Sequence, residues 1–374
     1  MKAIINGRII LENKVLDKSI LIFNEKFQNI INEMDDDYEI IDAKGNYVSP
    51  GFIDVHVHGA MGYDTMDADL EGLKIIGKKV LENGVTSYLP TTMTMSDEEI
   101  HKAFDTVRKF MNDKDYIGAE PLGIHVEGPF INVLKKGAQN EKYIQKPNLD
   151  LIKDYMDIIK IITYAPEMDE DNRFLKEINK YKDVNLSMGH SNATFEEAMD
   201  AIENGAASFT HLFNAMTGLH HRNPGMIGAS FKSNVYSELI ADTIHVNKGL
   251  FQTLMDIKKD KLLLITDGMS AKCMEPGDYE LGGQKVAVNE NSARLEDGTL
   301  AGSILKLNEA IKNVYKNVKN PINEVVNMAS IYPARMINED KTIGSIEIGK
   351  NADICIFDEN IDIKMTFKNG ERVF

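Results

Sequence analysis

The stretch Phe52-Ile53-Asp54-Val55-His56-Val57-His58-Gly59 gives the first clear indication of the fold. Its apolar residues predict a buried strand, and two histidines stand near its carboxyl end. Because alternate residues of a strand share one face, His56 and His58 are expected to project the same way. Two imidazoles placed like this can share a metal ion, although a hydrogen-bonded pair of core histidines would leave the same pattern.

The chain that follows this strand alternates between short apolar runs and amphipathic helical stretches. Strands are predicted at residues 52–58, 85–92, 121–127, 160–165, 183–189, 206–211, 235–244 and 261–266. Helices are predicted between them, for example at 69–83, 96–112, 194–204 and 248–258. Eight strands alternating with helices indicate an α/β fold of the (β/α)8 TIM-barrel type, for which about 250 residues are usual. An open doubly wound sheet is the alternative, but no G-x-G-x-x-G motif follows the first strand.

The two ends of the chain have a different texture. Residues 1–48 and 343–374 consist of short predicted strands and tight turns such as Asn6-Gly7. Neither end has enough apolar surface to form an independent domain. We therefore predict one small β-sandwich built from both ends, and a barrel domain over residues 49–342 with a β-hairpin insertion near 277–300.

The composition excludes several classes of protein. The formal net charge is −16, from 42 basic and 58 acidic residues, whereas nucleic-acid binding needs clustered lysine and arginine. No apolar run reaches the roughly 18 residues that a membrane span needs, and the amino terminus lacks the apolar core of a signal peptide. Cys273 and Cys355 lie far apart and in no CxxC pattern, so no disulfide framework is expected. We expect a cytoplasmic protein.

Polar residues with catalytic potential follow the predicted strands, at the end where the active sites of barrels form. Glu127 ends the third strand, and a carboxylate there is costly unless it is paired or metal-bound. His190 and His211 end the fifth and sixth strands. A single histidine at a strand end is usually structural, but this set, together with His56 and His58, is hard to explain by coincidence. Carboxylate and imidazole ligands suit zinc or a related divalent ion such as iron.

Three more residues near the strand ends leave alternatives open. Asp267 follows four apolar residues of the eighth strand. It could be a helix N-cap or, beside a metal ion, a general base for a water molecule. His125 shares the face of Glu127 one layer deeper, so we interpret it as a satisfied buried histidine. His245 could be a ligand, a substrate contact or a supporting group, and its spacing does not decide between them.

The loop after the sixth strand contains an arginine in an otherwise acidic protein. The planar guanidinium of Arg222 suits a phosphate group. A solvated surface arginine is the alternative, which we would prefer if the loop did not follow the strand that ends in His211. His220 and His221 are adjacent and cannot point the same way, so we assign them no role.

The ordered motifs of the chain resemble those of the N-acetylglucosamine-6-phosphate deacetylases of the amidohydrolase superfamily. These motifs are H-x-H at 56–58, H-V-E-G-P-F at 125–130, G-H-S at 189–191, H-L-F-N-A-M at 211–216, R-N-P-G at 222–225 and T-D-G at 266–268. The segments 48–54 and 344–353 also resemble the places where chains of this superfamily enter and leave the barrel. The resemblance covers essentially the whole chain, and H-V-E-G-P-F with H-L-F-N-A-M is its most particular part.

This resemblance implies roles for individual residues. It implies that Glu127, His190 and His211 hold the principal metal ion and that Asp267 is the catalytic acid and base. Members without the first-strand histidine pair bind one metal ion, whereas His56 and His58 permit a second ion here. The cofactor is then a divalent ion, zinc or iron, with one or two ions per subunit.

The resemblance also implies how the substrate is bound. The residues that match its substrate contacts are Ala138, Asn214, Ala215, Arg222, His245, Leu300, Ala301, Gly302 and Ser303. In this family the phosphate-binding arginine comes from the neighbouring subunit, which implies a homodimer. Position 139 departs from the family pattern, because it is Gln139 where histidine is common. Glutamine can donate a hydrogen bond but cannot carry a proton at neutral pH.

The implied activity is hydrolysis of N-acetyl-D-glucosamine 6-phosphate to D-glucosamine 6-phosphate and acetate, a step of amino-sugar catabolism. The nearest alternatives are an N-acetylgalactosamine-6-phosphate deacetylase and a cyclic amidase of the dihydroorotase or hydantoinase type. Cyclic amidases bridge two metal ions with a modified lysine that ends the fourth strand, and segment 161–167 supplies none. A catalytically inactive scaffold is an alternative from another class. It would need neither the ligand set nor Asp267.

Overall fold

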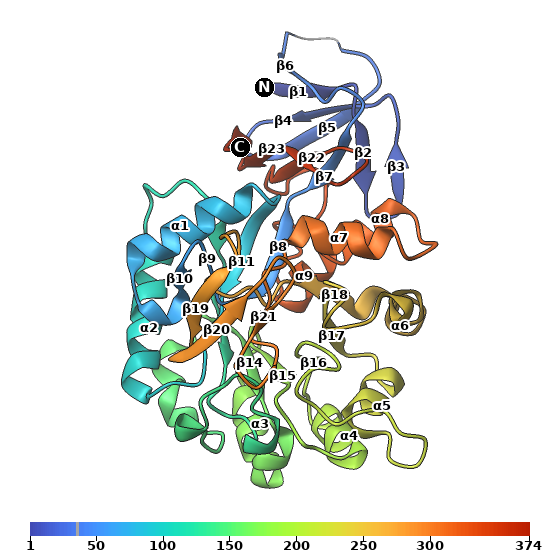
Figure 1. Cartoon of the computed structure of the whole chain (residues 1–374). Coiled ribbons are helices and arrows are strands. Elements are labelled where there is room, and N and C mark those ends of the chain that lie inside the picture. The colour runs from blue at the N-terminus through green and yellow to red at the C-terminus, as the bar shows by residue number, and fades with distance from the viewer. Residues whose placement is uncertain (35–36) are drawn as a thin grey trace.

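The computed structural model describes residues 1–34 and 37–374. Parallel strands form its centre, helices cover their outer side, and smaller sheets at one end contain both chain ends (Figure 1). None of the helices in these two ranges is both long and apolar enough to cross a bilayer. The arrangement places the strand ends that carry the polar motifs away from the two termini.

The central strands run in two hydrogen-bonded orders, β12-β11-β8 and β13-β14-β15-β16-β17-β18. Their bounds are β8 Phe52–Val57, β11 Val85–Pro90, β12 Glu120–Pro121, β13 Ile124–Glu127, β14 Ile159–Tyr164, β15 Asn185–Met188, β16 Ser208–Phe209, β17 Tyr236–Ile240 and β18 Leu262–Ile265. Parallel bridges from Thr91 to His125 and from Val57 to Gly268 connect the two groups. The strands therefore form a curled parallel sheet. Each predicted strand has a counterpart in the structure, but 121–127 is divided into β12 and β13, and the strands at 206–211 and 235–244 are shorter than predicted.

The helices follow from amphipathic stretches with clear starting residues. Helix α2 begins after Ser96, which forms a reciprocal capping box with Glu99. Thr194 and Glu197 cap α4 in the same way. The α-helices are α1 Leu70–Leu81, α2 Asp97–Met111, α3 Arg173–Ile178, α4 Phe195–Glu203, α5 Gly225–Lys232, α6 Phe251–Lys258, α7 Leu307–Tyr315, α8 Ile322–Asn327 and α9 Ile331–Met336. The four predicted helical stretches are confirmed.

Short 3-10 turns complete the connections between these elements. They are η1 Thr65–Asp67, η2 Val133–Lys135, η3 Glu141–Tyr143, η4 Leu149–Leu151, η5 Lys153–Tyr155, η6 Pro166–Met168, η7 Glu170–Asn172, η8 Lys248–Leu250 and η9 Lys259–Lys261. A small antiparallel pair, β9 Gly59–Ala60 and β10 Tyr63–Asp64, directly follows the first central strand. The pair β9–β10 and the turns η1, η2 and η6 follow the carboxyl ends of central strands, whereas η9 directly precedes β18.

The two chain ends form two mixed sheets, and one of these sheets contains strands from both ends. One sheet has the order β5-β4-β1-β6 and another the order β24-β23-β22-β7-β2-β3. Their bounds are β1 Lys2–Ile5, β2 Arg8–Leu11, β3 Lys14–Leu16, β4 Ile20–Phe23, β5 Phe27–Ile31, β6 Glu39–Asp42, β7 Tyr47–Pro50, β22 Ile354–Phe357, β23 Ile363–Lys368 and β24 Glu371–Arg372. Strand β7 pairs with both β2 and β22, so one sheet joins the start and the end of the chain. A separate apolar cluster that includes Phe23, Val48 and Ile354 packs these sheets.

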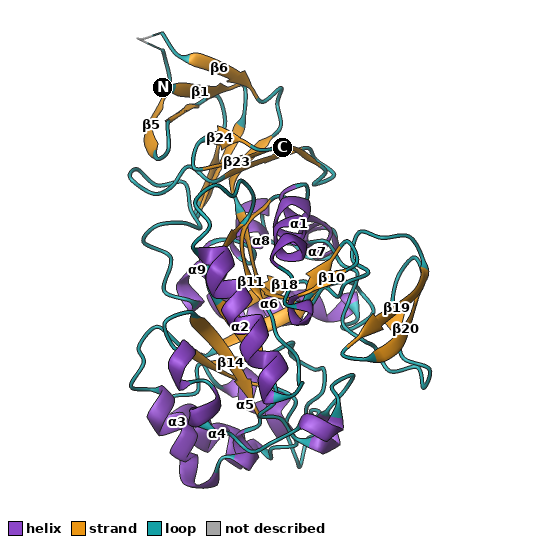
Figure 2. Ribbon diagram, turned by 90° about the vertical axis from the view of Figure 1, so that its left-hand side faces the viewer, coloured by secondary structure: helices purple, strands orange, loops and turns teal. Residues whose placement is uncertain are grey.

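A hairpin formed by β19 Gly277–Leu281 and β20 Gln284–Val288 lies at the mouth of the central strands. Its turn, Gly282-Gly283, has φ values of 55° and 78°, which suit the tight turns of two-residue hairpins. A short strand, β21 Ala293–Arg294, pairs with β20. Figure 2 shows the hairpin projecting to one side of the central layer. Its apolar residues pack with Met93 and Ala138 in a cluster of their own, so the hairpin forms a wall of the site below.

Candidate metal centre

Several polar residues at the strand ends adopt an unusual backbone conformation. His190, His211 and Asp267 have φ values of 46°, 31° and 49°. This left-handed region is disfavoured for residues with a Cβ atom, at a cost of roughly 1–3 kcal/mol each. Such strain persists only where the surroundings enforce it, and it clusters at functional sites. At each position the chain turns sharply as its strand ends.

Glu127, His190 and His211 form the first group of ligand atoms. The Oε1 atom of Glu127 lies 3.3 Å from Nε2 of His190 and 3.0 Å from Nε2 of His211. The two Nε2 atoms lie 3.1 Å apart. His190 donates from Nδ1 to the carbonyl of Lys135 at 2.8 Å, which leaves the lone pair on its Nε2. Three buried donor atoms that converge in this way suit a divalent cation.

His56, His58 and Asp267 form a second group beside the first. The Nε2 atom of His58 lies 3.2 Å from Oδ1 of Asp267 and 3.2 Å from Oε2 of Glu127. His58 can donate from Nδ1 to the carbonyl of Thr91 at 3.2 Å, so in the neutral ring its Nε2 carries the lone pair. Glu127 therefore lies between the two groups and faces both with its two oxygens.

One nitrogen of the second group provides a test of whether the site fits a metal ion. Nε2 of His56 is buried and has no hydrogen-bond partner among the described residues. It nevertheless lies 3.4 Å from Oε1 of Glu127 and 3.5 Å from Oδ1 of Asp267. A buried nitrogen that faces carboxylate oxygens without a hydrogen bond needs a compensating group. The donor set, imidazole nitrogens and carboxylate oxygens, fits a divalent ion.

The electrostatics of the two groups favour a cation. Burial alone lowers the pKa of His58, but Asp267 and Glu127 outweigh this effect and raise the pKa to about 10. Burial also lowers the pKa of His56, but the negative charges of Glu127, Asp267 and Glu238 outweigh it and raise this pKa well above 6.5. Burial opposes the charge of Glu127, yet the charge of His56 and the hydrogen bonds of neighbouring histidines lower its pKa well below 4.5. The carboxylates therefore stay ionised, and protons on the imidazoles or a bound metal ion must balance them.

A cavity of about 490 Å³ opens above these groups. The predicted substrate-contact residues that line it are Ala138, Asn214, Ala215, His245, Leu300 and Gly302. His245 is held there by Asp242, whose Oδ2 lies 2.6 Å from its Nδ1. The structure thus brings most of the predicted contacts together around the metal-binding residues.

Three predicted contact residues lie elsewhere. Ala301 and Ser303 are buried behind the cavity wall, and the backbone nitrogen of Ser303 donates to the carbonyl of Asp267 at 2.7 Å. Ser303 therefore holds the loop that carries Asp267. Arg222 is exposed and does not line the cavity of its own chain. Its guanidinium contacts only the neighbouring His221 among the described residues, at 2.7 Å.

Gln139, at the position where the sequence departs from the family pattern, is buried in the cavity wall. Its side-chain nitrogen donates to Oε2 of Glu127 at 2.9 Å, and its oxygen accepts from the backbone nitrogen of Thr94 at 2.7 Å. The amide therefore fixes Oε2, the oxygen that also faces His58, while Oε1 faces His56, His190 and His211.

His125 is buried with both ring nitrogens hydrogen-bonded, as predicted. Its Nδ1 donates to the carbonyl of Val55 at 3.0 Å, so Nε2 must accept from the hydroxyl of Thr163 at 2.8 Å. This order fixes the direction of the next bonds, from Thr210 to Thr163 and from Ser187 to Thr210. Burial and the nearby His56 lower the pKa of His125 well below 6.5. A layer of directed hydrogen bonds thus lies beneath the metal-binding groups.

The buried charged residues that the sequence analysis did not single out include Glu238 and Lys272, which contact residues of the central strands. Glu238 lies in the apolar run of β17, fully buried beside His56. Lys272 is also fully buried, and its Nζ donates to Thr266 at 3.1 Å and lies 3.7 Å from Asp54. A charged residue inside an apolar strand is a usable signal for Glu238, because such a residue requires a partner. Lys272 gives no such signal, since it follows the strands in a loop.

Comparison with known proteins places the chain in a family. The sequence pattern of the Amidohydrolase family matches residues 47–373. The chain is 36% identical to the N-acetylglucosamine-6-phosphate deacetylase of Bacillus subtilis, over 98% of this chain and 95% of the relative. It is 38% identical to that of Lysinibacillus sphaericus, over 88% and 86%. The crystal structure of the Pasteurella multocida N-acetylglucosamine-6-phosphate deacetylase has a TM-score of 0.93 to this chain at 33% identity, with 99% of both chains covered. The chain therefore belongs to the amidohydrolase family and, within it, to the N-acetylglucosamine-6-phosphate deacetylases.

Proposed function

We propose that this protein is a metal-dependent hydrolase that converts N-acetyl-D-glucosamine 6-phosphate to D-glucosamine 6-phosphate and acetate. One observation carries the proposal. Asp267 lies beside the converging ligand atoms of Glu127 and four histidines, at the base of a cavity large enough for a small molecule. The reaction belongs to amino-sugar catabolism.

The ligand roles follow the two groups of side chains. Glu127, His190 and His211 would hold the principal ion, and His56 and His58, with Asp267, have the donor set for a second. When bound, the divalent ion activates water and polarises the acetyl oxygen. Imidazole and carboxylate ligands suit zinc or iron, with one or two ions per subunit.

Asp267 has the central chemical role in this proposal. Its carboxylate accepts the proton of the attacking water and then delivers it to the amide nitrogen of the substrate. Without that proton, the leaving amine would depart as a strongly basic anion. The left-handed backbone of Asp267, held by the backbone bond from Ser303, keeps the carboxylate aimed into the cavity.

The substrate contacts also form part of the proposal. Asn214, the backbone of Ala215, and His245 bind the sugar phosphate, and Leu300 and Gly302 contribute to the wall. Arg222 binds the phosphate of the neighbouring subunit's substrate in a homodimer. Its exposure, outside the cavity of its own chain, supports this arrangement.

We also propose a closed (β/α)8 barrel over residues 49–342, with a β-sandwich of residues 1–48 and 343–374. The backbone bridges at both ends of the two parallel strand groups support closure. A cytoplasmic setting belongs to the same proposal, on the grounds of composition.

Acetate release from a panel of N-acetyl sugars, measured with the bound metal ions counted, tests the function. The metal-loaded protein should release acetate from N-acetylglucosamine 6-phosphate much faster than from unphosphorylated N-acetylglucosamine. N-acetylgalactosamine 6-phosphate in the same panel tests the epimer preference. A protein with full metal content that releases no acetate from any phosphorylated sugar would refute the proposal.

Arg222→Ala tests the phosphate contact within this panel. The change should raise KM for the phosphorylated sugar by tens- to hundreds-fold, equivalent to roughly 2–3 kcal/mol for a lost charge-assisted contact. The unphosphorylated sugar should be almost unaffected, since it has no phosphate. Equal damage to both sugars would mean that Arg222 supports the subunit contact or the fold instead.

A further inference from the structure

Glu238 is a carboxylate buried inside the central layer of strands. It lies in β17 (Tyr236–Ile240), between Ser237 and Leu239, and its exposed fraction is 0%. Burying an ionised carboxylate among apolar residues is costly unless other groups compensate. The compensating groups of Glu238 therefore indicate why the residue is there.

The side-chain carboxylate of Glu238 accepts two hydrogen bonds, and both donors belong to residues of the metal centre. Its Oε2 atom accepts from Nδ1 of His56 at 3.0 Å and from the backbone nitrogen of His211 at 3.1 Å. Its backbone carbonyl accepts from the nitrogen of Leu212 at 2.8 Å. Its Oε1 atom has no hydrogen-bond partner in the part of the chain that the structure describes. One residue thus holds His56 on β8 and the turn that follows β16.

The bond to His56 sets the orientation of that imidazole. With Nδ1 donating to Glu238, the Nε2 atom faces Glu127 and Asp267. Carboxylates that accept from the second nitrogen of a metal-binding histidine fix its tautomer and raise its basicity. The bond to His211 acts on the backbone instead. It holds the residue in its left-handed conformation, with φ of 31°.

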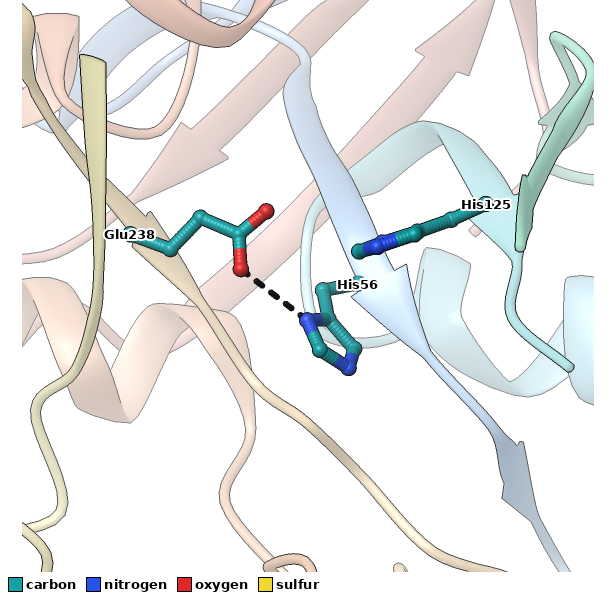
Figure 3. A group of neighbouring side chains, drawn as sticks. All are labelled: His56, His125 and Glu238. Atoms are coloured by element: carbon teal, nitrogen blue, oxygen red, sulfur yellow. Dashed lines mark hydrogen bonds and ion pairs between the residues drawn. The ribbon is translucent and has the colours of Figure 1, made fainter. Parts of the chain in front are cut away.

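A third metal site is the alternative explanation for Glu238. The ligand atoms of Glu238, His56 and His125 lie within 4.8 Å of one another. Both nitrogens of His125 are already hydrogen-bonded, however, and neither has a free lone pair. Figure 3 shows Glu238 and His125 on opposite sides of the His56 ring, with the hydrogen bond on the side of Glu238. The geometry therefore favours a supporting role over a ligand role.

We propose that Glu238 is a positioning residue for both halves of the metal centre. Its single carboxylate orients the Nε2 atom of His56 toward one ion and holds the backbone that aims His211 at the other. The inference rests on the proposed function only in requiring that metal ions bind here. Its test therefore measures metal binding and not deacetylation.

Glu238→Gln and Glu238→Leu provide graded tests. Glutamine keeps the shape and one acceptor oxygen but removes the charge. Leucine leaves two buried N–H groups without an acceptor. Apoprotein prepared with a chelator is titrated with Co²⁺, while the visible absorption spectrum and the bound metal per subunit are recorded. We expect Co²⁺ affinity to fall about 10- to 100-fold in Glu238→Gln, with an altered spectrum, and to fall further in Glu238→Leu.

Asp353→Asn is the matched control. Asp353 is also a buried carboxylate, but it pairs with Lys368 and Asn369, away from the metal centre. This variant should melt at a lower temperature yet bind Co²⁺ with the normal affinity and spectrum. Normal Co²⁺ binding by Glu238→Gln, or equal damage in Asp353→Asn, would overturn the proposal.

The outcomes for the unchanged protein separate the two proposals. If it binds Co²⁺ but releases no acetate, the proposed function fails and the role of Glu238 is still decided by the variants. If it binds no divalent ion, both proposals fail. If Glu238→Leu does not fold, Glu238→Gln alone decides the outcome, because it changes the side-chain volume very little.

Discussion

Two groups of buried charged side chains lie in different parts of the molecule, and their chemistry differs. Near the start of β8, Lys368 lies 2.8 Å from Oδ2 of Asp353 and 2.7 Å from Glu120. Burial lowers the pKa of Lys368, but these two carboxylates outweigh it and raise the pKa above 10.5. The other oxygen of Asp353 accepts from the backbone nitrogen of Asn369 at 2.9 Å. The charges and hydrogen bonds of this group are therefore satisfied by protein atoms alone, with no need of a bound ion.

The metal centre, at the carboxyl ends of the same strands, is not complete in that sense. Its carboxylates face imidazole nitrogens, and Nε2 of His56 has no hydrogen-bond partner among the residues that the structure describes. No lysine or arginine within salt-bridge distance neutralises Glu127 or Asp267 in the described ranges; only histidines do. This contrast distinguishes a structural ion pair from a binding site. A structural pair contains its own counter-charge, whereas a binding site contains donor atoms that need one.

Replacing Glu127 should give the largest effect. In Glu127→Ala the carboxylate that lies between both ligand groups is lost, so tight metal binding and turnover should both be abolished. Metal content measured after dialysis, together with acetate release, checks this. A variant with full metal content and normal activity would show that the centre needs no added counter-charge and is as self-sufficient as the pair around Lys368.

Asp267→Asn should give the next largest effect. Asparagine keeps the shape of the side chain but cannot accept a proton, so kcat should fall by about a hundredfold or more. Steady-state kinetics at saturating metal and substrate measure this fall. Near-normal kcat would exclude Asp267 as the acid and base, and would make it a ligand or a structural residue only.

His58→Asn tests whether the metal centre holds two ions. If His56 and His58 help to bind a second ion, this change should remove about one equivalent of metal and leave the ion of Glu127, His190 and His211 in place. Elemental analysis of the purified variant gives the stoichiometry. An unchanged metal count would mean that the histidine pair is structural or that only one ion binds.

Asp353→Asn should have the smallest effect on the chemistry. It removes one partner of buried Lys368, which should lower the free energy of unfolding by about 3–5 kcal/mol, the usual cost of breaking a buried ion pair. Metal content and kcat should stay at their normal values. Chemical denaturation together with the metal count checks both statements, and a loss of metal would show that the two buried groups are not independent.

The sequence was sufficient for most of the fold because its apolar runs are long and regularly spaced. Leu262–Ile265 and the aspartate that follows were predictable from four consecutive apolar residues and one acid. The ends of two strands were predicted too long, at 206–211 and 235–244. His211 and Thr243 leave the strand conformation there, with φ values of 31° and 71°. Hydrophobic periodicity carries no information on a left-handed turn at a non-glycine residue.

The supporting residues of the site were harder to predict than its donor atoms. The donor atoms stand at strand ends, where position alone indicates a role. Glu238 contacts His56 across 182 positions of sequence, and only the pairing of β17 with its neighbours brings it there. Gln139 is similar, since its bond to Glu127 depends on how a loop folds back over β13. Contacts of this kind depend on the tertiary structure, so they cannot be predicted from the pattern of a single sequence.

The left-handed turns at the strand ends also explain which amino acids act as donors at each place. Histidine and aspartate are among the few non-glycine types that are enriched at positive φ. They occupy the positions where the backbone itself turns, His190, His211 and Asp267. Glutamate has no such tolerance, and Glu127 remains in regular strand while the next residue, Gly128, takes the positive φ of 80°. A glutamate placed at any of these three positive-φ positions, although it offers the same kind of donor atom as Asp267, would therefore stand on a backbone that it does not tolerate well.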